Sequence, residues 1–273
     1  MKIGAVVVWY QPDKSVCFNI KSYAQYCDEL YIIDNSENEN EHLLPNRKAK
    51  YVSLHENKGI AYALNYGIKM ALEDGCDWVL TMDQDSSFDN RIIDVYKKYI
   101  LEHNTQDVAI LCPQYRTDRA DLQPKGQFNS KEYVMQSANL MNMKIYKEVG
   151  GFVDELFIDC VDYEYCLRVR KQNYKIIECT DAVLAHQPAE TKSVRILWKT
   201  IKYGLASPLR YYYQIRNLRY LIHKYHNMKM LLILFMKVAK ILLLFVNKKE
   251  YLRAVKAANY DYKHKNFGRK DGI

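Results

Sequence analysis

The sequence predicts an α/β protein with a mostly parallel sheet and helices on both faces of the sheet. Short apolar runs, typical of strands that are buried on both sides, occur at residues 3–9, 30–33, 51–54, 78–82 and 108–112. Segments with a helical spacing of apolar residues occur at 15–27, 60–73 and 91–103. The alternation of these two kinds of segment is the pattern of an α/β sheet.

The elements of the first half are the best defined. The first strand reads IGAVVVW, and a turn at Pro12 and Asp13 separates it from the first helix. The helix at 60–73 carries its apolar residues on one stripe, formed by Ala61, Leu64, Ile68 and Leu72. A stripe of this width indicates a helix that packs on the sheet.

The pattern is weaker after residue 113. Residues 114–132 are polar, and we expect a loop there. Short helices are expected at 144–149, where Gly150 and Gly151 follow, and at 162–171. The segment 174–186 is expected to hold two short strands, and the chain from Ser193 onward is basic, aromatic and expected to be helical.

The charge of the chain is unevenly distributed. The chain has 273 residues and a net charge of +8. Residues 191–273 contain 19 Lys/Arg and 3 Asp/Glu, a net of +16, so residues 1–190 carry a net of −8. Such an asymmetry indicates an acidic part with one task and a basic part that meets an anionic partner. We therefore expect a catalytic domain at 1–220 and a basic helical tail at 221–273.

The cysteines and the N-terminal residues indicate a cytoplasmic protein. The seven cysteines form no Cys-x-x-Cys pair, and we expect reduced, mostly buried thiols. A strand-like segment follows Met1 almost at once, without the apolar core and cleavage site of a signal peptide.

The leucine-rich segment 228–246 approaches the length of a membrane span. Lys229, Lys237 and Lys240 interrupt it, and a lysine near the centre of a span costs about 2.5–3.5 kcal/mol. The three lysines share one face of a helical wheel, which favours an amphipathic helix in the plane of a membrane surface. A helix that packs on the catalytic domain is the alternative.

Carboxylates follow two of the predicted strands. Asp34 ends the strand at 30–33, and Asp83 and Asp85 follow the strand at 78–82. Ligands of open α/β sheets bind just beyond the carboxyl ends of the strands. Two carboxylates one residue apart can share a divalent cation, and hard oxygen ligands suit Mg²⁺ or Mn²⁺.

Two further clusters carry residues suited to binding or catalysis. Asn57, Lys58 and Gly59 precede a helix whose unpaired amides favour phosphate, although an ordinary helix cap explains them equally well. Asp162 stands where a loop becomes a helix, and such a carboxylate can accept a proton from a hydroxyl, or simply cap the helix. Glu164 lies beside it.

His186 and Arg210 are the remaining candidates. His186 ends a predicted strand and suits a metal or a diphosphate, although a lone histidine is more often structural. Arg210 begins a segment dense in arginine and tyrosine, which can bind phosphate or stack on a sugar. RNA binding by base stacking would need a recognisable module, and none is visible in the sequence.

In this order, the clusters resemble glycosyltransferase family 2, and within it the rhamnosyltransferase-like branch of bacterial surface-polysaccharide biosynthesis. The resemblance covers about residues 3–220. The matching segments are the strand end at 6–10, Ile33-Asp34-Asn35-Ser36, Asn57-Lys58-Gly59 with Asn65 and Gly67, Asp83-Gln84-Asp85, Gly150-Gly151-Phe152, Phe157-Ile158-Asp159, Asp162-Tyr163-Glu164 with Leu167-Arg168, His186, and Arg210-Tyr211-Tyr212 with Arg216-Asn217. One departure is Val161, which replaces the first acid of the Glu-Asp pair common in the family, as it does in the rhamnosyltransferase-like branch.

The resemblance implies a GT-A fold and an inverting, metal-dependent hexosyltransferase of the O-antigen or capsule type. Asp34 would contact the nucleotide, Asp83 would support the nucleotide or the metal, and Asp85 would be the main ligand of Mg²⁺ or Mn²⁺. Asp162 matches the general base, and His186 would assist at the metal and diphosphate. Lys58 and Arg210 are implied more weakly, as phosphate contacts.

The resemblance also implies partners and a location. The donor would be a nucleotide sugar, with dTDP-rhamnose expected first and a UDP-hexose or UDP-galactofuranose as alternatives. The acceptor would be a lipid-linked oligosaccharide, so we expect a peripheral enzyme at the inner face of the bacterial cytoplasmic membrane, held by the basic tail on anionic lipid. A homodimer through the Tyr-rich tail is possible, and no nucleic acid is expected as a partner.

Other functions fit the residues less well. A phosphatase of the Asp-x-Asp type would need a Thr or Val where Ser87 stands, and a nucleotidyltransferase would need a Gly-rich, Arg-containing loop after the first strand. A membrane- or RNA-binding module without catalysis would leave Asp34, Asp83, Asp85 and Asp162 unexplained.

Overall fold

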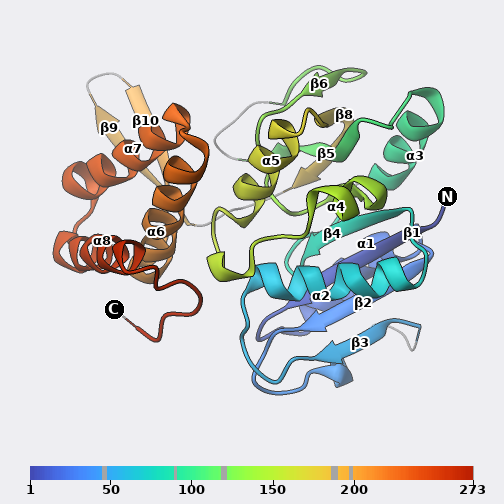
Figure 1. Ribbon diagram of the computed structural model, residues 1–273, viewed down its shortest axis with the longest axis horizontal. Coiled ribbons are helices and arrows are strands. Elements are labelled where there is room, and N and C mark those ends of the chain that lie inside the picture. Colours follow the sequence, from blue (N-terminus) through green and yellow to red (C-terminus); the bar gives the residue numbers. More distant parts are fainter. Residues whose placement is uncertain (45–47, 89–90, 118–121, 186–189, 197–198, 273) are drawn as a thin grey trace. The chain divides into compact units, whose positions relative to one another are not determined.

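The computed structural model describes residues 1–44, 48–88, 91–117, 122–185, 190–196 and 199–272 (Figure 1). The chain divides into two compact units. The first, here called the sheet unit, comprises Met1–Val153 and Asp162–His186. The second, here called the helical unit, comprises Asp154–Val161 and Gln187–Ile273. Helix α6 (Pro208–Tyr225) packs with the C-terminal helices and belongs to the helical unit. The division of function between a catalytic domain at 1–220 and a basic tail at 221–273 stays a prediction.

The sheet unit contains eight of the strands in the described residues. They are β1 (Ile3–Trp9), β2 (Glu29–Asp34), β3 (Lys50–Ser53), β4 (Trp78–Asp83), β5 (Val108–Arg116), β6 (Phe128–Ser130), β7 (Asn139–Asn142) and β8 (Lys175–Ala185). Their order in the sheet is β3-β2-β1-β4-β7-β5-β8-β6. The pairs β2–β3, β1–β2 and β1–β4 are parallel, and β7 runs antiparallel to both β4 and β5.

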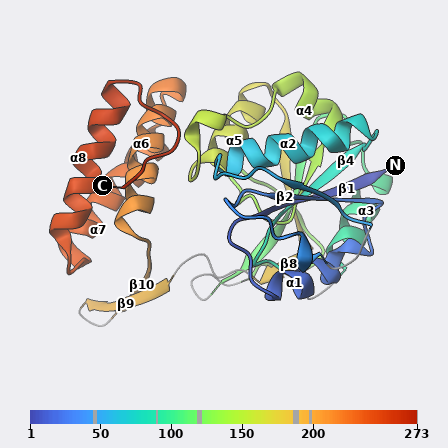
Figure 2. The same cartoon turned by 90° about the horizontal axis from the view of Figure 1, so that it is seen from below.

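The helices of this unit cover both faces of the sheet, as the sequence predicts. They are α1 (Ser15–Ala24), α2 (Ile60–Glu73), α3 (Ile92–Glu102), α4 (Met143–Val149) and α5 (Val161–Lys171), with a short 3-10 turn η1 at Glu41–Leu43. Figure 2 shows α2 and α4 on one face and α1 on the other. Every residue of β1 is buried, because alternate side chains of this central strand meet helices on opposite faces.

The packing on each face follows from the residues of β1. Ile3, Ala5 and Val7 belong to the core that α1 and α3 cover. On the opposite face, Gly67 of α2 lies against β1, and a Cβ at this glycine would stand 2.5 Å from a methyl group of Val6. The absence of a side chain therefore allows α2 to approach the sheet closely.

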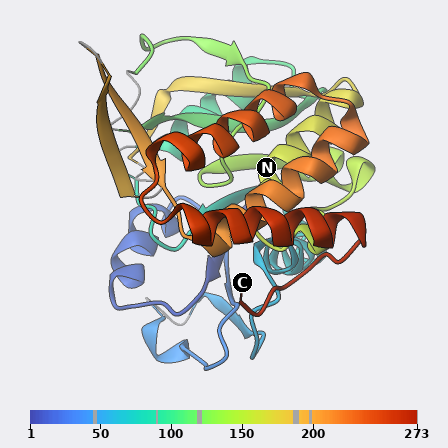
Figure 3. The same ribbon diagram turned by 90° about the vertical axis from the view of Figure 1, so that its left-hand side faces the viewer.

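Over its described residues, the helical unit combines a hairpin with three helices. The hairpin strands are β9 (Glu190–Ile196) and β10 (Lys199–Leu205), and the helices are α6, α7 (Met228–Leu244) and α8 (Lys248–Lys263), with the 3-10 turn η2 at Asp154–Leu156. Tyr212 and Tyr213 of α6 pack with Ala254 and Ala258 of α8 and with Phe157 from the loop after η2. Figure 3 shows the three helices side by side, in orange to red.

Three local predictions are wrong. Within the segment expected to hold two strands, Lys175–Ala185 form the one long strand β8, which a shift of register in its pairing with β5 bends without breaking. The chain after Ser193 does not begin with a helix, because β9 and β10 pair as antiparallel strands before α6 starts. The loop expected at 114–132 is interrupted, since β5 continues to Arg116 and β6 adds an edge strand.

Two other sequence features can be compared with the structure. All seven cysteines, each within the described residues, are free thiols, and five of them are buried. Within the part of the chain that the structure describes, no helix combines the length and the apolar character needed to cross a bilayer.

Candidate active site

The carboxyl ends of β1, β2 and β4 meet at one edge of the sheet. The strands pair in parallel, with Asp34 opposite Trp9 and Asp83 opposite Val8. The ends of β2 and β4 therefore lie on either side of the end of β1. This is the edge at which ligands bind in open α/β sheets.

The carboxylate of Asp34 is fully buried and shapes the loop that follows β2. It accepts hydrogen bonds from the backbone N–H of Ser36 at 3.1 Å, from the backbone and side-chain amides of Asn40 at 3.0 and 2.9 Å, and from the hydroxyl of Tyr51 at 2.6 Å. Burial, followed by the hydrogen bond to Asp34, raises the pKa of the Tyr51 phenol above its ordinary value. Tyr51 therefore remains a neutral donor to Asp34 at physiological pH.

Asn35 joins this loop to the turn that begins α2. Its side-chain amide donates to Asn57 Oδ1 at 3.0 Å, and its side-chain carbonyl accepts the backbone N–H of Lys58 at 2.8 Å. Asn57 Oδ1 also accepts the N–H of Gly59, whose φ of 88° lies in the left-handed region. Nothing in the sequence had indicated Asn35 as the residue that connects the two predicted clusters.

The side chain of Lys58 lies at the same turn. Its Nζ is 2.9 Å from Glu56 Oε1 and 5.0 Å from the centre of the Tyr62 ring. The hydrogen bond to Glu56 raises the pKa of Lys58, so the ammonium stays charged at neutral pH. Its role as a phosphate contact stays a prediction.

Gln84 fixes the turn after β4. Its side-chain carbonyl accepts the backbone N–H of Tyr10 at 2.8 Å, and its amide donates to the carbonyl of Tyr10 at 3.1 Å. The backbone carbonyl of Gln84 accepts from Asn19 Nδ2 at 2.9 Å. The middle residue of the Asp-x-Asp sequence thus ties the ends of β4 and β1 together, leaving Asp83 half-buried and Asp85 exposed.

The donor set at this turn fits a divalent cation that takes most of its ligands from a substrate. Asp83 and Asp85 supply hard oxygens on one turn, and Mg²⁺ is commonly held by one or two carboxylates together with phosphate oxygens and water. No group of three or more His, Cys, Asp or Glu side chains suited to a metal occurs within the described residues. His186, the third predicted ligand, lies outside them.

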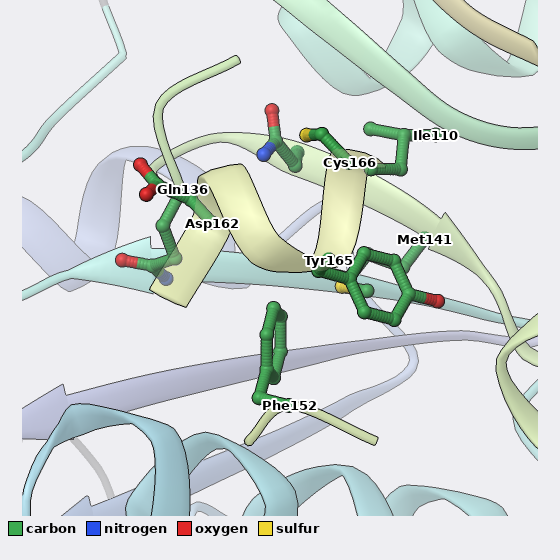
Figure 4. A pocket seen from close by; sticks show the side chains of 8 residues that line it. Ile110, Gln136, Met141, Phe152, Asp162, Tyr165 and Cys166 are labelled. Atoms are coloured by element: carbon green, nitrogen blue, oxygen red, sulfur yellow. The ribbon is translucent and has the colours of Figure 1, made fainter. Parts of the chain in front are cut away.

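Asp162 is the second residue of α5 and lines a small pocket of the sheet unit. Its Oδ1 accepts the backbone N–H of Tyr163 at 2.8 Å, as expected for a carboxylate in the first helical turn. The other lining residues are Ile110, Gln136, Asn139, Met141, Phe152, Tyr165 and Cys166. Figure 4 shows Asp162 and Gln136 close together at one end of this pocket.

Tyr115 links the surroundings of Asp162 to those of Asp83. Its hydroxyl donates to the carbonyl of Met135 at 2.7 Å. The pKa of Tyr115 is raised well above its ordinary value, mainly by burial, and the nearby acids that add to the shift include Asp162 and Asp83. The two predicted carboxylates therefore act electrostatically on the same phenol from different elements.

Glu164 has a structural partner. It is fully buried and forms an ion pair with Arg168, with 2.8 Å between Oε2 and Nη2. Arg168 in turn donates to the carbonyls of Val149, Gly150 and Gly151. The pair fixes α5 to the loop after α4, and so helps to set the position of the helix that carries Asp162.

Arg210 forms a two-point ion pair in the helical unit. Its Nε and Nη2 donate to Asp159 Oδ2 and Oδ1 at 2.6 and 2.8 Å. Gln214 Nε2 donates to the same carboxylate at 3.2 Å, and Lys237 Nζ donates to Gln214 Oε1 at 2.7 Å. Asp159 was part of the predicted pattern, but the sequence did not indicate that it binds Arg210.

Two neighbouring residues of α6 hold the loop that precedes α5. Asn217 is fully buried, and its Nδ2 lies 2.8–2.9 Å from the carbonyl oxygens of Leu156, Ile158 and Asp159. Arg216 donates to the carbonyl of Leu156 at 3.1 Å and to that of Gly268 at 2.9 Å. Arg216 and Asn217 therefore hold the backbone of this loop through hydrogen bonds to its carbonyl groups, here called the Arg-Asn clamp.

Sequence comparison identifies the family. The model of glycosyl transferase family 2 matches residues 16–157. The chain is 30% identical over 242 residues to the dTDP-rhamnosyl transferase RfbF of Shigella flexneri, and the match covers 82% of this chain and 81% of that protein. The chain belongs to glycosyl transferase family 2. The resemblance to its rhamnosyltransferase-like branch is confirmed by the same two matches.

Solved structures confirm the GT-A fold of this glycosyltransferase. The crystal structure of GalNAc-T7 with UDP, GalNAc and Mn2+ is similar, with a TM-score of 0.62 and 13% identity over 97% of this chain and 57% of that chain. The crystal structure of S. aureus TarS has a TM-score of 0.51 and 16% identity over 96% of this chain and 44% of that chain. The glycosyltransferase thus spans about half the length of these two chains, and at such identities the likeness concerns the fold alone.

Proposed function

We propose that this glycosyltransferase transfers L-rhamnose from dTDP-rhamnose to a lipid-linked glycan acceptor, with inversion at the anomeric carbon. The observation that carries the proposal is the 30% identity to a dTDP-rhamnosyl transferase over more than four fifths of both chains. A UDP-hexose or UDP-galactofuranose is the alternative donor. The product would be part of an O-antigen, capsule or cell-wall polysaccharide.

We propose Asp162 as the general base. Its position at the start of α5 supports this role, because the first turn of a helix favours the ionised carboxylate that must accept a proton. In an inverting transfer, Asp162 removes the proton of the acceptor hydroxyl while that oxygen attacks the anomeric carbon. The bond from this carbon to the diphosphate oxygen breaks on the opposite face, and no covalent sugar–enzyme intermediate forms.

We propose that Asp85, with Asp83, holds Mg²⁺ or Mn²⁺. When bound, the cation neutralises charge on the nucleoside diphosphate leaving group. Asp34 would act at the nucleotide through the loop it orders, and the Asn57-Lys58-Gly59 turn would face the diphosphate. His186 as a metal contact and Arg210 as a phosphate contact remain proposals from the resemblance. Any contact of Arg210 with phosphate would compete with its ion pair to Asp159.

A lipid-linked acceptor would place the enzyme at the inner face of the cytoplasmic membrane as a peripheral protein. The net charge of +16 in residues 191–273 supports attraction to anionic lipid. We also propose a homodimer contact through the tyrosines of the tail.

A donor screen by thermal shift tests the proposed function. A ligand that binds the native state raises the melting temperature. We expect dTDP-rhamnose with Mg²⁺ or Mn²⁺ to raise the Tm, and UDP- and GDP-sugars to raise it less. A larger rise with a UDP-sugar would replace rhamnose by that sugar, and transfer of radiolabelled sugar to a membrane lipid extract would then test the acceptor. The absence of both a shift and any transfer would overturn the proposal.

A further inference from the structure

Helix α7 exposes one face that is entirely apolar. This face, here called the α7 apolar face, consists of large side chains that are 42–76% exposed: Met228, Leu231, Leu232, Phe235, Met236, Leu242 and Leu243. On a helical wheel of 100° per residue they fall within one continuous arc. Val246, just beyond the helix, is 95% exposed. Contiguous apolar exposure of this kind marks an interaction surface.

The opposite side of α7 packs inside the helical unit. Met230 and Ile241 are fully buried there. Lys237 lies on this packed side, where it donates to Gln214 and stands 5.4 Å from the ring centre of Tyr211. Lys240 stands 5.8 Å from the ring centre of Tyr203. Two of the three lysines that share one face of the helical wheel, Lys237 and Lys240, therefore lie beside tyrosine rings, and no cation falls within the arc of the α7 apolar face.

The residues around this face are cationic. Lys229 is exposed at the start of α7, and Lys248, Lys249 and Arg253 are exposed just after it. Residues 222–260 contain eight Lys/Arg and a single acid, Glu250. An apolar stripe bordered by lysine and arginine is the pattern of a helix that lies in a membrane interface. A second copy of the chain would bring a surface of the same charge against this one, which disfavours a dimer through this face.

We propose that the α7 apolar face docks this glycosyltransferase on an anionic lipid bilayer. Leu232, Phe235 and Leu243 enter the interface between headgroups and acyl chains, while Lys248, Lys249 and Arg253 meet the negative headgroups. This proposal rests on the proposed function in one respect. The purpose of docking would be to bring the enzyme to a lipid-linked acceptor. The surface itself rests on the exposure and charge of these residues.

Vesicle sedimentation of the full chain tests the proposal. We expect the protein to sediment with vesicles of phosphatidylglycerol and phosphatidylcholine, and much less with pure phosphatidylcholine. The triple variant Leu232→Gln, Phe235→Gln, Leu243→Gln should lose binding more than tenfold, and Lys248→Gln with Lys249→Gln should lose binding to the anionic vesicles only. The matched control is Phe18→Gln with Leu101→Gln, two exposed apolar residues of the sheet unit that are 74% and 82% exposed, and it should bind as the parent does.

Three outcomes would overturn the proposal. Failure of the parent protein to sediment with anionic vesicles would do so directly. Equal loss in the control pair would mean that any exposed apolar residue contributes. A parent dimer in analytical ultracentrifugation that the triple variant abolishes, without vesicle binding, would assign the face to a second copy. The donor-induced thermal shift of the triple variant separates this proposal from the proposed function, because it should be unchanged even where vesicle binding is lost.

Discussion

Arg210 holds Asp159 with two parallel hydrogen bonds of 2.6 and 2.8 Å, and Asp159 lies three residues before Asp162. The loop between η2 and α5 has an unusual backbone, because Phe157, Asp159 and Cys160 have φ values of 65°, 63° and 61°. Non-glycine residues adopt this region only at a cost in free energy. Such a conformation persists only where surrounding contacts hold it. The contacts here come from α6.

The ion pair between Arg210 and Asp159 gives a prediction about additivity. Arg210→Gln and Asp159→Asn should each lower the free energy of unfolding by about 0.5–1 kcal/mol, because the arginine is half-exposed and the pair is screened by water. The double variant should cost no more than the larger single change, since both remove the same contact. Urea denaturation measures all three. A weaker binding of the nucleotide-sugar donor to Arg210→Gln, but not to Asp159→Asn, would show that Arg210 also contacts phosphate.

Asn217 should matter more than its exposed neighbours on α6. Asn217→Ala removes the donor shared by three backbone carbonyls and should lower the free energy of unfolding by about 1–3 kcal/mol, the usual cost of leaving buried polar groups unpaired. The control is His223→Ala, an exposed position on the same helix. Denaturation midpoints that coincide for the two variants would contradict the clamp assigned to Asn217.

The close approach of α2 to the sheet gives a rescue experiment. Gly67→Ala should destabilise the protein by about 1–3 kcal/mol, because the new methyl group would stand 2.5 Å from a methyl carbon of Val6. Adding Val6→Ala removes that carbon, so the double variant should regain part of the loss. Thermal melts measure both, and a double variant less stable than Gly67→Ala alone would contradict this account of the packing.

Metal removal tests the turn at Asp83 and Asp85. The rise in Tm that the nucleotide-sugar donor causes should disappear on treatment with EDTA and return with Mn²⁺. The variant Asp85→Ala should show no such rise, with EDTA or with Mn²⁺. The half-exposed Asp94 of α3, changed to Ala, is a control outside this turn and should keep the full rise in Tm. A donor-induced shift that persists through EDTA would mean that the donor binds without a cation.

The framework of the fold could be predicted from the sequence, because strands buried on both faces leave continuous apolar runs. The whole of β1 is such a run, and its register brings Asp34 and Asp83 to one edge. The hairpin β9–β10 was missed because antiparallel pairing between two separate segments leaves no local pattern in either of them.

The site was predictable in outline but not in its contacts. The place of Asp162 in the first turn of a helix was predicted because a helix start is a local feature of the sequence, whereas its role as base stays a prediction. The bonds from Asn35 to Asn57 and from Gln84 to Tyr10 join residues 22 and 74 positions apart, and no local pattern encodes them. The outward direction of the α7 apolar face likewise depends on which side of α7 packs against the tyrosines of α6.

Asp162→Asn is the sharpest test of the chemistry. An amide has nearly the shape of the carboxylate and can still accept the N–H of Tyr163, so the fold and the donor-induced Tm rise should be kept. It cannot take a proton from the acceptor, so kcat should fall by about 10²–10⁴, the usual contribution of a general base. Steady-state kinetics with the accepted donor measure this, and Asp162→Glu should recover part of the rate by restoring a carboxylate. Equal loss of donor binding in Asp162→Asn and Asp85→Ala would mean that the two carboxylates share one role, contrary to the division proposed between proton transfer and the diphosphate.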